Sequence, residues 1–384
     1  MELPHRALVT LLALLLLPLV AEAQLAVSAN DNKVRLDNGV NKVVPNAPPD
    51  TLSVIDLKVS PPRVVAEVPV PASVVGPPTS VAVAPDESIA LVTSAAKIDP
   101  NDATKTVPDN RVSVVDLKAT PPTVLATLEA GRGAAGVSIN RQGTLALVAN
   151  RGEGTVSVFA IQGKTVTPAG RVTIADEKSG PSHPAFTPDG KMALVTRDGD
   201  HKISVLSIDG TKVEYTKRDL NAGLRPYGID VSSKGDVAVV ANIGAGQGDT
   251  DTVSLIDVRA QPPRVVDTIS VGQTPEGVKV SPDGSIIAAV VMNGSNKARE
   301  SPFYHDNGKL VLLRAAGMKL SKVTEAPIGH WSQGAAFSPD GKTILVGNMV
   351  EKDIHVFSWD GSALKEIGRL KVNGGPAAVR TAEK

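Results

Sequence analysis

The 384-residue chain contains no cysteine. It therefore forms no disulfide bond, and it offers no thiolate as a metal ligand or as a nucleophile. It also has no excess of either charge, because 40 Lys and Arg residues balance 40 Asp and Glu residues. A chain without surplus positive charge is not expected to bind nucleic acid or an anionic membrane surface.

Aromatic residues are scarce: the chain has two Trp, three Tyr and five Phe. Surfaces that bind single-stranded nucleic acid or sugars usually stack their ligands on aromatic rings, so both classes of partner are disfavoured. The few tryptophans do not recur as a Trp-Asp pair in each repeat, which also argues against a WD40 propeller.

Long apolar runs are missing after the first 23 residues. Within those residues, Arg6 precedes the apolar segment 7–20, and Ala21-Glu22-Ala23 is typical of a signal-peptidase cleavage site before Gln24. The apolar segment is shorter than the roughly 20 residues that a membrane span needs. We therefore predict a signal peptide over 1–23, a periplasmic or secreted protein, and no membrane span once the peptide is removed.

The remainder of the chain is repetitive. The repeats can be aligned on their turns of the Ser-Pro-Asp-Gly type. The residues nine positions before the turn glycine, or at the equivalent position, are 44 to 57 residues apart, and they are Pro78, Ala134, Pro181, Pro226, Pro275, Ser332 and Pro376. Short runs of β-branched and other apolar residues follow each position, as in Val278-Lys279-Val280. A period near 40–50 residues made of strands is typical of propeller blades.

Four such runs form one repeat, and the two ends of the chain complement each other. The C-terminus supplies only an inner run, 376–380, and the N-terminus supplies the three runs that this one lacks, at 25–30, 51–57 and 63–70. The sequence therefore predicts an all-β fold: a seven-bladed β-propeller with four antiparallel strands per blade and one blade shared between the termini. We expect residues 24–384 to form a single domain, because each blade packs only on its neighbours.

The loops are uneven in length. The turns that follow the inner runs are short, whereas long connections occur at 30–50, 93–111, 242–252 and 292–309. These long loops all lie on the face where the inner strands begin, which we call the top face. Function concentrates on loops that a rigid scaffold presents, so we expect the functional site there.

Polar residues cluster at the start of four consecutive inner runs, where they should line the mouth of the central channel. Glu276 or His330 could activate a water molecule, and Arg225 could hold a carboxylate or a phosphate, so these three are the candidate catalytic residues. The candidate ligand-binding residues are His183, Tyr227, Trp331 and Gln333 at the mouth, with Asn150, Arg197, Asn242, Asn293 and Asn348 at the ends of the second strands. The alternative is that all of them are ordinary polar residues at a wet rim.

A metal site is not predicted. The histidines show no close ligand spacing, and a catalytic zinc ion usually takes three protein ligands within reach. The oxygen-rich segments 99–102 and 249–251 lack the glycine and the distal glutamate of an EF-hand, so calcium or another divalent cation is left open without a motif. No other cofactor is predicted, and we expect a monomer.

One charged pair has a structural interpretation. Asp230 and Lys279 occupy the same position in two consecutive inner strands, each within an otherwise apolar run. We predict an ion pair between the two blades, with the charged atoms within direct contact distance.

These repeats resemble a known family. The pattern Pro-x-Gly-x-x-x-Ser-Pro-Asp-Gly, then a strand ending in Val-x-Asn and a run like Val-Ser-Val-Ile-Asp, resembles the YVTN-type β-propeller repeat. It is best matched at 275–284, 335–348, 147–158 and 226–257. The chain is also similar to the broader seven-bladed lactonase-like family, which includes 6-phosphogluconolactonase and carboxymuconate-lactonising enzymes. That resemblance implies His, Arg and Glu residues at the channel mouth, similar in kind to His183, Arg225, Glu276 and His330.

Two functions follow as hypotheses. In the first, a secreted or periplasmic propeller binds a small molecule or a protein partner on its top face. In the second, the same face is the active site of a lactone hydrolase. Sites are grafted onto folds, so the repeat pattern alone does not choose between them. Convergence of Glu276, His330 and Arg225 on one water molecule would favour the enzyme.

Overall fold

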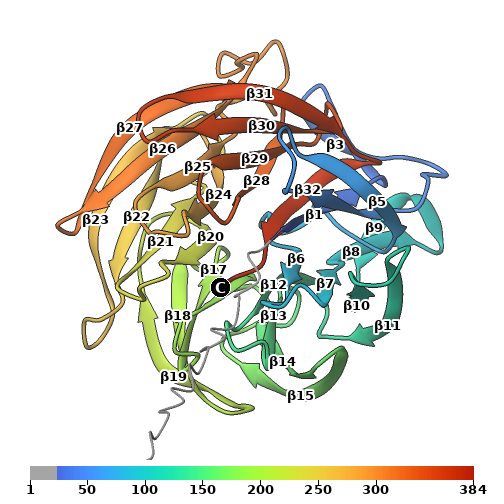
Figure 1. The fold of residues 1–384 in the computed structure, drawn as a ribbon, viewed down its shortest axis with the longest axis vertical. Helices are drawn as coiled ribbons and strands as arrows, with labels where there is room; N and C mark the ends of the chain where they lie inside the picture. The colour runs from blue at the N-terminus through green and yellow to red at the C-terminus, as the bar shows by residue number, and fades with distance from the viewer. Residues whose placement is uncertain (1–23) are drawn as a thin grey trace, which may run out of the picture.

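A computed structural model describes residues 24–384, and the predicted signal peptide lies outside these residues. Seven four-stranded antiparallel sheets are arranged as blades around a central channel (Figure 1). This confirms the predicted seven-bladed β-propeller. No helix in the described part of the chain is long and apolar enough to cross a membrane.

Each blade runs from an inner strand at the channel to an outer strand at the rim. The inner strands are β32 (Gly375–Thr381), β6 (Val81–Val83), β12 (Ala134–Ile139), β16 (Pro181–Phe186), β20 (Pro226–Val231), β24 (Pro275–Val280) and β28 (Ser332–Phe337). The second strands are β1 (Leu25–Asp31), β7 (Ile89–Thr93), β13 (Leu145–Asn150), β17 (Met192–Arg197), β21 (Val237–Asn242), β25 (Ile287–Val291) and β29 (Thr343–Asn348).

The third and outer strands complete the blades. The third strands are β4 (Thr51–Asp56), β10 (Arg111–Asp116), β14 (Thr155–Gln162), β18 (Lys202–Asp209), β22 (Asp251–Asp257), β26 (Gly308–Ala316) and β30 (Asp353–Trp359). The outer strands are β5 (Arg63–Pro69), β11 (Thr123–Glu129), β15 (Thr165–Thr173), β19 (Lys212–Leu220), β23 (Arg264–Gly272), β27 (Lys319–Ile328) and β31 (Leu364–Lys371).

The burial of each strand follows from its place in the blade. Second strands such as β13 are buried at every residue, because a neighbouring blade covers each of their faces. Outer strands such as β11 are mostly exposed. The core is therefore a ring of layers between blades; in one layer, Leu91 of one blade lies in the same apolar cluster as Val148 and Phe159 of the next.

The turn between the inner and second strands explains the recurring Ser-Pro-Asp-Gly sequence. In the blade of β28, the Gly341 amide donates to the Ser338 carbonyl at 2.9 Å, and Gly341 has a φ of 69°. The Ser338 hydroxyl donates to Asp340 at 2.6 Å and accepts the Thr343 amide at 2.8 Å. Only a residue that tolerates positive φ fits the last position without strain, which is why glycine recurs there.

Strand β1 closes the ring, as predicted. It pairs with β32 on one side and with β4 on the other, so that the first and last described strands share a sheet. Closure leaves only short sheet edges, and those of the inner strands are protected inside the channel. Asp230 and Lys279 form the predicted ion pair between blades, with 3.1 Å between the charged atoms.

Candidate functional site on the top face

A cavity of about 320 Å³ lies on the top face, above the channel. Its floor and walls are formed by Tyr227, Glu276 and Gln333, each the second residue of an inner strand. Arg151, which follows β13, and Trp331, which precedes β28, complete the wall. The volume is near the lower end of the range for small-molecule sites.

The blades close the channel below this cavity. The next inner-strand position is glycine in four blades, at 136, 228, 277 and 334, and an added Cβ would lie 2.3–2.9 Å from the neighbouring blade or from Pro78. A side chain at any of these four positions would collide with a neighbouring blade or with Pro78. The top cavity shares no lining residue with the cavities at the lower end, so it forms a site of its own.

Two hairpins cover the cavity. β2 (Val34–Asp37) pairs with β3 (Val40–Val43), and β8 (Ala96–Asp99) pairs with β9 (Asp102–Pro108). β3 lies against β9, and Lys42 and Thr106 contribute to the cavity lining. Both hairpins lie in long top loops that the sequence picks out, so the predicted long loops form a cap over the channel mouth.

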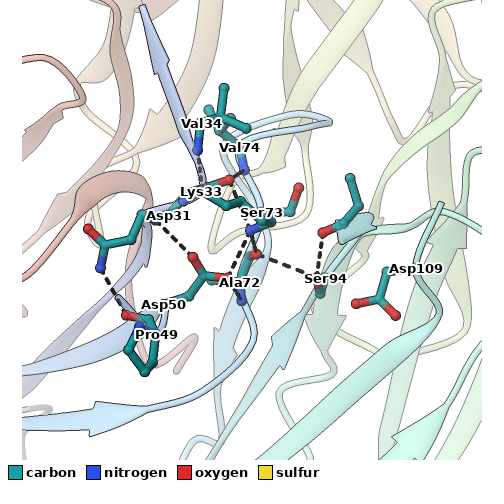
Figure 2. Close-up of polar contacts among 12 residues, drawn as sticks. Asp31, Lys33, Val34, Pro49, Asp50, Ala72, Ser73, Val74, Ser94 and Asp109 are labelled. Carbon is teal, nitrogen blue, oxygen red and sulfur yellow. Dashed lines mark hydrogen bonds and ion pairs between the residues drawn. The ribbon is translucent and has the colours of Figure 1, made fainter. Parts of the chain in front are cut away.

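The first hairpin is anchored by a buried ion cluster (Figure 2). Lys33, just before β2, lies 3.1 Å from Asp31 and 2.8 Å from Asp50, and its ammonium group also donates to the Ala72 carbonyl. Asp31 in turn accepts the backbone amides of Val34 at 3.1 Å and Val74 at 2.9 Å. These bonds fix the entry of the hairpin, and an apolar cluster that includes Val34 and Trp331 seats it on the top face.

An Arg–Asp–Arg chain runs along one side of the cavity. Asp198 lies 2.7 Å from Arg151 and 3.1 Å from Arg225, and it accepts the Ser182 hydroxyl at 2.8 Å. Burial is the largest single influence and would raise the pKa of Asp198, but the charge of Arg151 and the hydrogen bonds from Arg151, Ser182 and Arg225 together lower the pKa. Asp198 is therefore ionised and holds two guanidinium groups beside the cavity.

Glu276 is the unusual group in the cavity. Its residue is 8% exposed, and within residues 24–384 its carboxyl group makes no hydrogen bond or ion pair. Burial raises its pKa to about 8, although Arg225 and Arg151 act in the opposite direction. A carboxyl group that titrates near neutral pH can both accept and return a proton, as general acid–base catalysis requires.

The backbone at the rim is strained at three residues. Arg225, Thr274 and Trp331 each precede an inner strand and have φ values of 56°, 53° and 50°. The corresponding residues of two other blades are glycines with positive φ, at 133 and 180. A non-glycine residue in this conformation costs on the order of 1–3 kcal/mol, and such strain gathers at functional sites. Two of the three, Arg225 and Trp331, are among the residues predicted for the site.

The structure brings together part of the predicted set. Glu276, Tyr227, Trp331 and Gln333 line one cavity, and Arg225 joins them through Asp198. The Arg151 guanidinium lies 5.6 Å from the centroid of the Tyr227 ring, and burial raises the pKa of the Tyr227 hydroxyl well above its ordinary value. Tyr227 is therefore a neutral part of the wall.

His330 lies apart from this cavity. Its Nδ1 is 2.6 Å from Glu351, whose carboxylate also accepts the His330 backbone amide. His330 is not among the residues that line the cavity, so the expected convergence with Glu276 on one water molecule is not found. The reason is local: Glu351, in the loop after β29, binds both the imidazole and the backbone amide of His330.

His183 faces the opposite end of the channel. It is the third residue of β16, whereas the residues that line the top cavity are the second residues of their strands. Its side chain occupies the level of the glycines and lines a cavity on the lower side, together with Ser138 and Arg380. The expectation that His183 lines the channel mouth is therefore wrong by one position. Because side chains alternate in direction along a strand, a shift of one residue points the side chain away from the top cavity.

The asparagines at the ends of the second strands are buried inside the blades. Asn150 accepts the Gly131 amide at 3.0 Å and donates to Thr155 at 2.9 Å and Ser157 at 3.0 Å. Asn242 and Asn348 bridge the equivalent strands of their own blades. These bonds tie the second strand to the third and leave the side chains away from the cavity.

Arg197 and Asn293 also lie outside the cavity lining. Arg197 occupies the same column as the asparagines and lies 2.5 Å from Asp200 and 3.4 Å from Asp219. Asn293 donates to the Asn307 carbonyl at 3.0 Å, within its own top loop. The structure therefore does not gather the predicted second-strand residues at the channel mouth.

The residues that the sequence interpretation missed stand one position further along. Arg151 follows Asn150, and Asp198 follows Arg197. Because neighbouring residues of an extended chain point in opposite directions, the residue after each buried column position faces the channel. A charged residue directly after the last residue of a second strand is therefore the sequence signal that could have identified Arg151 and Asp198.

Residues 24–384 contain no group of three or more His, Asp or Glu residues that could hold a metal ion. The calcium alternative consequently gains no support from the described side chains. The charged groups that line the cavity are the Glu276 carboxyl group, the Arg151 guanidinium and the Lys42 ammonium, and Arg225 lies behind them on Asp198.

A family model described as "Lactonase, 7-bladed beta-propeller" matches residues 109–222. This segment runs from the end of the blade of β6 through the blades of β12 and β16, and it includes Arg151 and Asp198. Over these residues the chain is similar to the lactonase family, and the seven-bladed fold of that family extends over the whole described chain. No curated protein sequence matches the chain.

Solved structures with the same fold include proteins of different function. A periplasmic gluconolactonase from Pseudomonas aeruginosa has a TM-score of 0.65 and 17% identity, covering 94% of this chain and 99% of that one. A Bacteroides fragilis protein provisionally named a 6-phosphogluconolactonase has a TM-score of 0.69 and 16% identity, covering 95% and 100%. Hydrazine synthase from Kuenenia stuttgartiensis has a TM-score of 0.63 and 18% identity, covering 81% and 91%. At these identities the likeness shows the fold alone.

Proposed function

We propose that the protein hydrolyses a lactone in the top cavity. The observation that carries the proposal is Glu276, a buried carboxyl group with a pKa raised to about 8 beside two guanidinium groups. The lactonase-family match over 109–222 supports the same reaction class. Propellers of this shape serve several functions, so the fold adds little to the choice.

The proposed reaction needs only groups of the cavity. Ionised Glu276 takes a proton from a water molecule, and the water oxygen bonds to the lactone carbonyl carbon. The negative charge on the carbonyl oxygen is stabilised by the guanidinium of Arg151, which Asp198 and Tyr227 hold in place. The ring C–O bond then breaks, and the ring oxygen takes the proton from Glu276. The product hydroxy acid ionises in solvent and releases one proton.

The test is a panel of γ- and δ-lactones, with and without an ionisable substituent, presented to purified 24–384 at about pH 8. Proton release is followed in weak buffer, and the hydroxy-acid product is identified by mass spectrometry. We expect turnover of at least one lactone above the rate in buffer, with a chelator having no effect. A panel without any turnover would overturn the proposal.

A second candidate function is binding without turnover. The observation that favours it is the cap, because two hairpins cover the cavity and admit only a small ligand or a narrow segment of a partner protein. A lactone or hydroxy acid that binds with measurable heat, remains unchanged, and loses affinity in Arg151→Gln would support this function.

We also propose that the protein is a monomer and that its blades are repeats of the YVTN type, as the pattern at 275–284 suggests.

We further propose that the protein acts in the periplasm or outside the cell. The sequence that supports this location is the apolar segment 7–20 with its Ala21-Glu22-Ala23 site. Expression of the full chain followed by N-terminal sequencing of the exported protein tests the location; a protein that keeps residues 1–23 inside the cell would contradict it.

A further inference from the structure

The lower end of the channel contains two adjoining cavities of about 40 Å³ and 110 Å³. Their walls come from the last residues of the inner strands and from the segment after β32, which ends near the centre of the ring (Figure 1). Both lie on the opposite side of the glycine positions from Glu276. They have no part in the proposed lactone hydrolysis.

Most charged groups of these cavities already have partners. Lys279 pairs with Asp230 at 3.1 Å and also with Glu383, from the segment after β32. Asp230 additionally accepts the Val280 amide at 2.7 Å. The Arg141 guanidinium, at the edge of both cavities, donates to the Ser233 carbonyl at 3.1 Å. The two carboxylates are therefore engaged by Lys279.

Arg380 is the exception. It lies on β32, is 6% exposed, and lines the smaller cavity. Within residues 24–384 its guanidinium makes no hydrogen bond and no ion pair. Arginine does not lose its proton in proteins, so burial cannot neutralise it. A buried charge without a partner costs several kcal/mol, and native proteins almost always pair one.

The neighbouring polar groups cannot serve as that partner. His183 Nδ1 accepts the Ile229 amide at 3.3 Å, and Nε2 lies 3.2 Å from the Ser138 hydroxyl. The Ser138 hydroxyl gives its own proton to the Pro184 carbonyl at 2.6 Å. Burial, and then the charges of Arg380 and Lys279, hold the pKa of His183 well below its usual value, so this imidazole is neutral. Asp230 and Glu383 line the same cavity and are attracted by the charge of Arg380, but both bond Lys279 and neither forms an ion pair with Arg380.

We propose that the smaller cavity binds a small carboxylate-type anion on Arg380, with formate, acetate or bicarbonate as the class of ligand. Two coplanar oxygens match the planar fork of a guanidinium. A cavity of about 40 Å³ admits an anion of a few atoms, since a single water needs roughly 10–15 Å³ on this measure. Larger tetrahedral anions such as sulfate fit this space less well.

The site has a consequence for the ring. Arg380 belongs to the strand that closes the propeller, and Glu383 holds the following segment in the channel through Lys279. An anion that neutralises Arg380 binds the closed ring and not the unfolded chain. The stability of closure therefore depends on the anion concentration.

The experiment measures the melting temperature of 24–384 in a zwitterionic buffer, with sodium formate or sodium chloride added at equal ionic strength. At formate about 100 times its Kd we expect the melting temperature to lie on the order of 3–4 °C above that in chloride, and to keep rising with the logarithm of the formate concentration. Arg380→Gln should melt at or above the wild type without formate and should not respond to it. Arg218→Gln, which removes an exposed arginine from β19, is the matched control and should respond as the wild type does.

Two further measurements keep the proposal open to refutation if the Arg380 variant folds poorly. Glu383→Gln removes the nearby carboxylate and should bind formate at least as tightly as the wild type. The ¹³C line of labelled formate should broaden with the wild type and sharpen on addition of acetate but not of chloride. An equal formate response in Arg380→Gln, or displacement of formate by chloride at the same concentration, would overturn the proposal.

Discussion

Replacing Glu276 with glutamine should make the protein more stable than the wild type, by an amount that grows as the pH rises. The folded protein holds the pKa of Glu276 at about 8, against an ordinary value of 4.5. A group whose pKa is raised on folding contributes stability that is fully present below its unfolded pKa. That stability is lost as the pH rises to its folded pKa. The window is therefore from about pH 4.5 to pH 8.

The magnitude follows from the size of the shift. Each pKa unit corresponds to about 1.4 kcal/mol, so the full shift amounts to about 5 kcal/mol. The residue is 8% exposed, so solvent screening reduces this figure little. Glutamine has nearly the same shape and cannot ionise. The variant should therefore gain several kcal/mol over the wild type between about pH 5 and pH 9.

The assay is urea unfolding of both proteins at unit pH steps across that window, followed by circular dichroism. Taking the difference between the two proteins cancels every other titrating group. Glu351→Gln is the matched control, because it removes a carboxylate of the same face that is paired with His330 instead of buried alone. A difference between wild type and Glu276→Gln that stays flat across the window would refute the reasoning.

Three other predictions concern the framework of the site. Asp198→Asn leaves Arg151 and Arg225 without their carboxylate, and we expect a loss of about 3–5 kcal/mol in urea unfolding; unchanged stability would contradict the ion chain. Asn150→Ala leaves buried partners unsatisfied and should cost about 1–3 kcal/mol without changing the KM for a lactone, whereas a raised KM would return Asn150 to the binding site. Deleting 374–384 removes β32 and should lower the melting temperature of the whole ring in a single transition, and an unaltered calorimetric trace would refute closure.

The fold could be predicted from the sequence because each blade repeats the same order of apolar strands and turns. The Ser-Pro-Asp-Gly turns, such as 338–341, mark where the inner strand ends, and the spacing of the repeats sets the number of blades. The Asp230–Lys279 pair was predictable for the same reason, since equal positions in neighbouring blades lie side by side.

The candidate site was harder to predict because a single position decides which way a side chain points. Glu276 and Gln333 stand at the second position of their strands and reach the cavity, whereas His183 stands at the third and faces the other end. Counting residues back from the turn glycine locates each inner strand, but it does not show which of its side chains point into the top cavity. Arg151 could not be predicted for a related reason. The recurring residue at the end of the second strand is Asn150, which is buried and structural, and the residue that lines the cavity is the next one, Arg151.

The position of the His330 side chain depends on a contact with Glu351, and the repeat pattern does not predict that contact. Glu351 lies in the loop after β29, and its 2.6 Å contact with His330 holds the imidazole away from the cavity. The cap is similar: long top loops were predicted, but the pairing of β2 with β3 and of β8 with β9 was not. Loop conformation depends on tertiary contacts, such as the Lys33 cluster, more than on local sequence (Figure 2).

The most direct test of the account compares kcat/KM for lactone hydrolysis in the wild type, Glu276→Gln and Glu351→Gln, from about pH 6 to pH 9.5. We predict a wild-type profile that rises through a pKa near 8, a loss of at least 100-fold in Glu276→Gln, and wild-type behaviour in Glu351→Gln. Turnover by Glu276→Gln at the wild-type rate would contradict the assignment of this cavity as the active site.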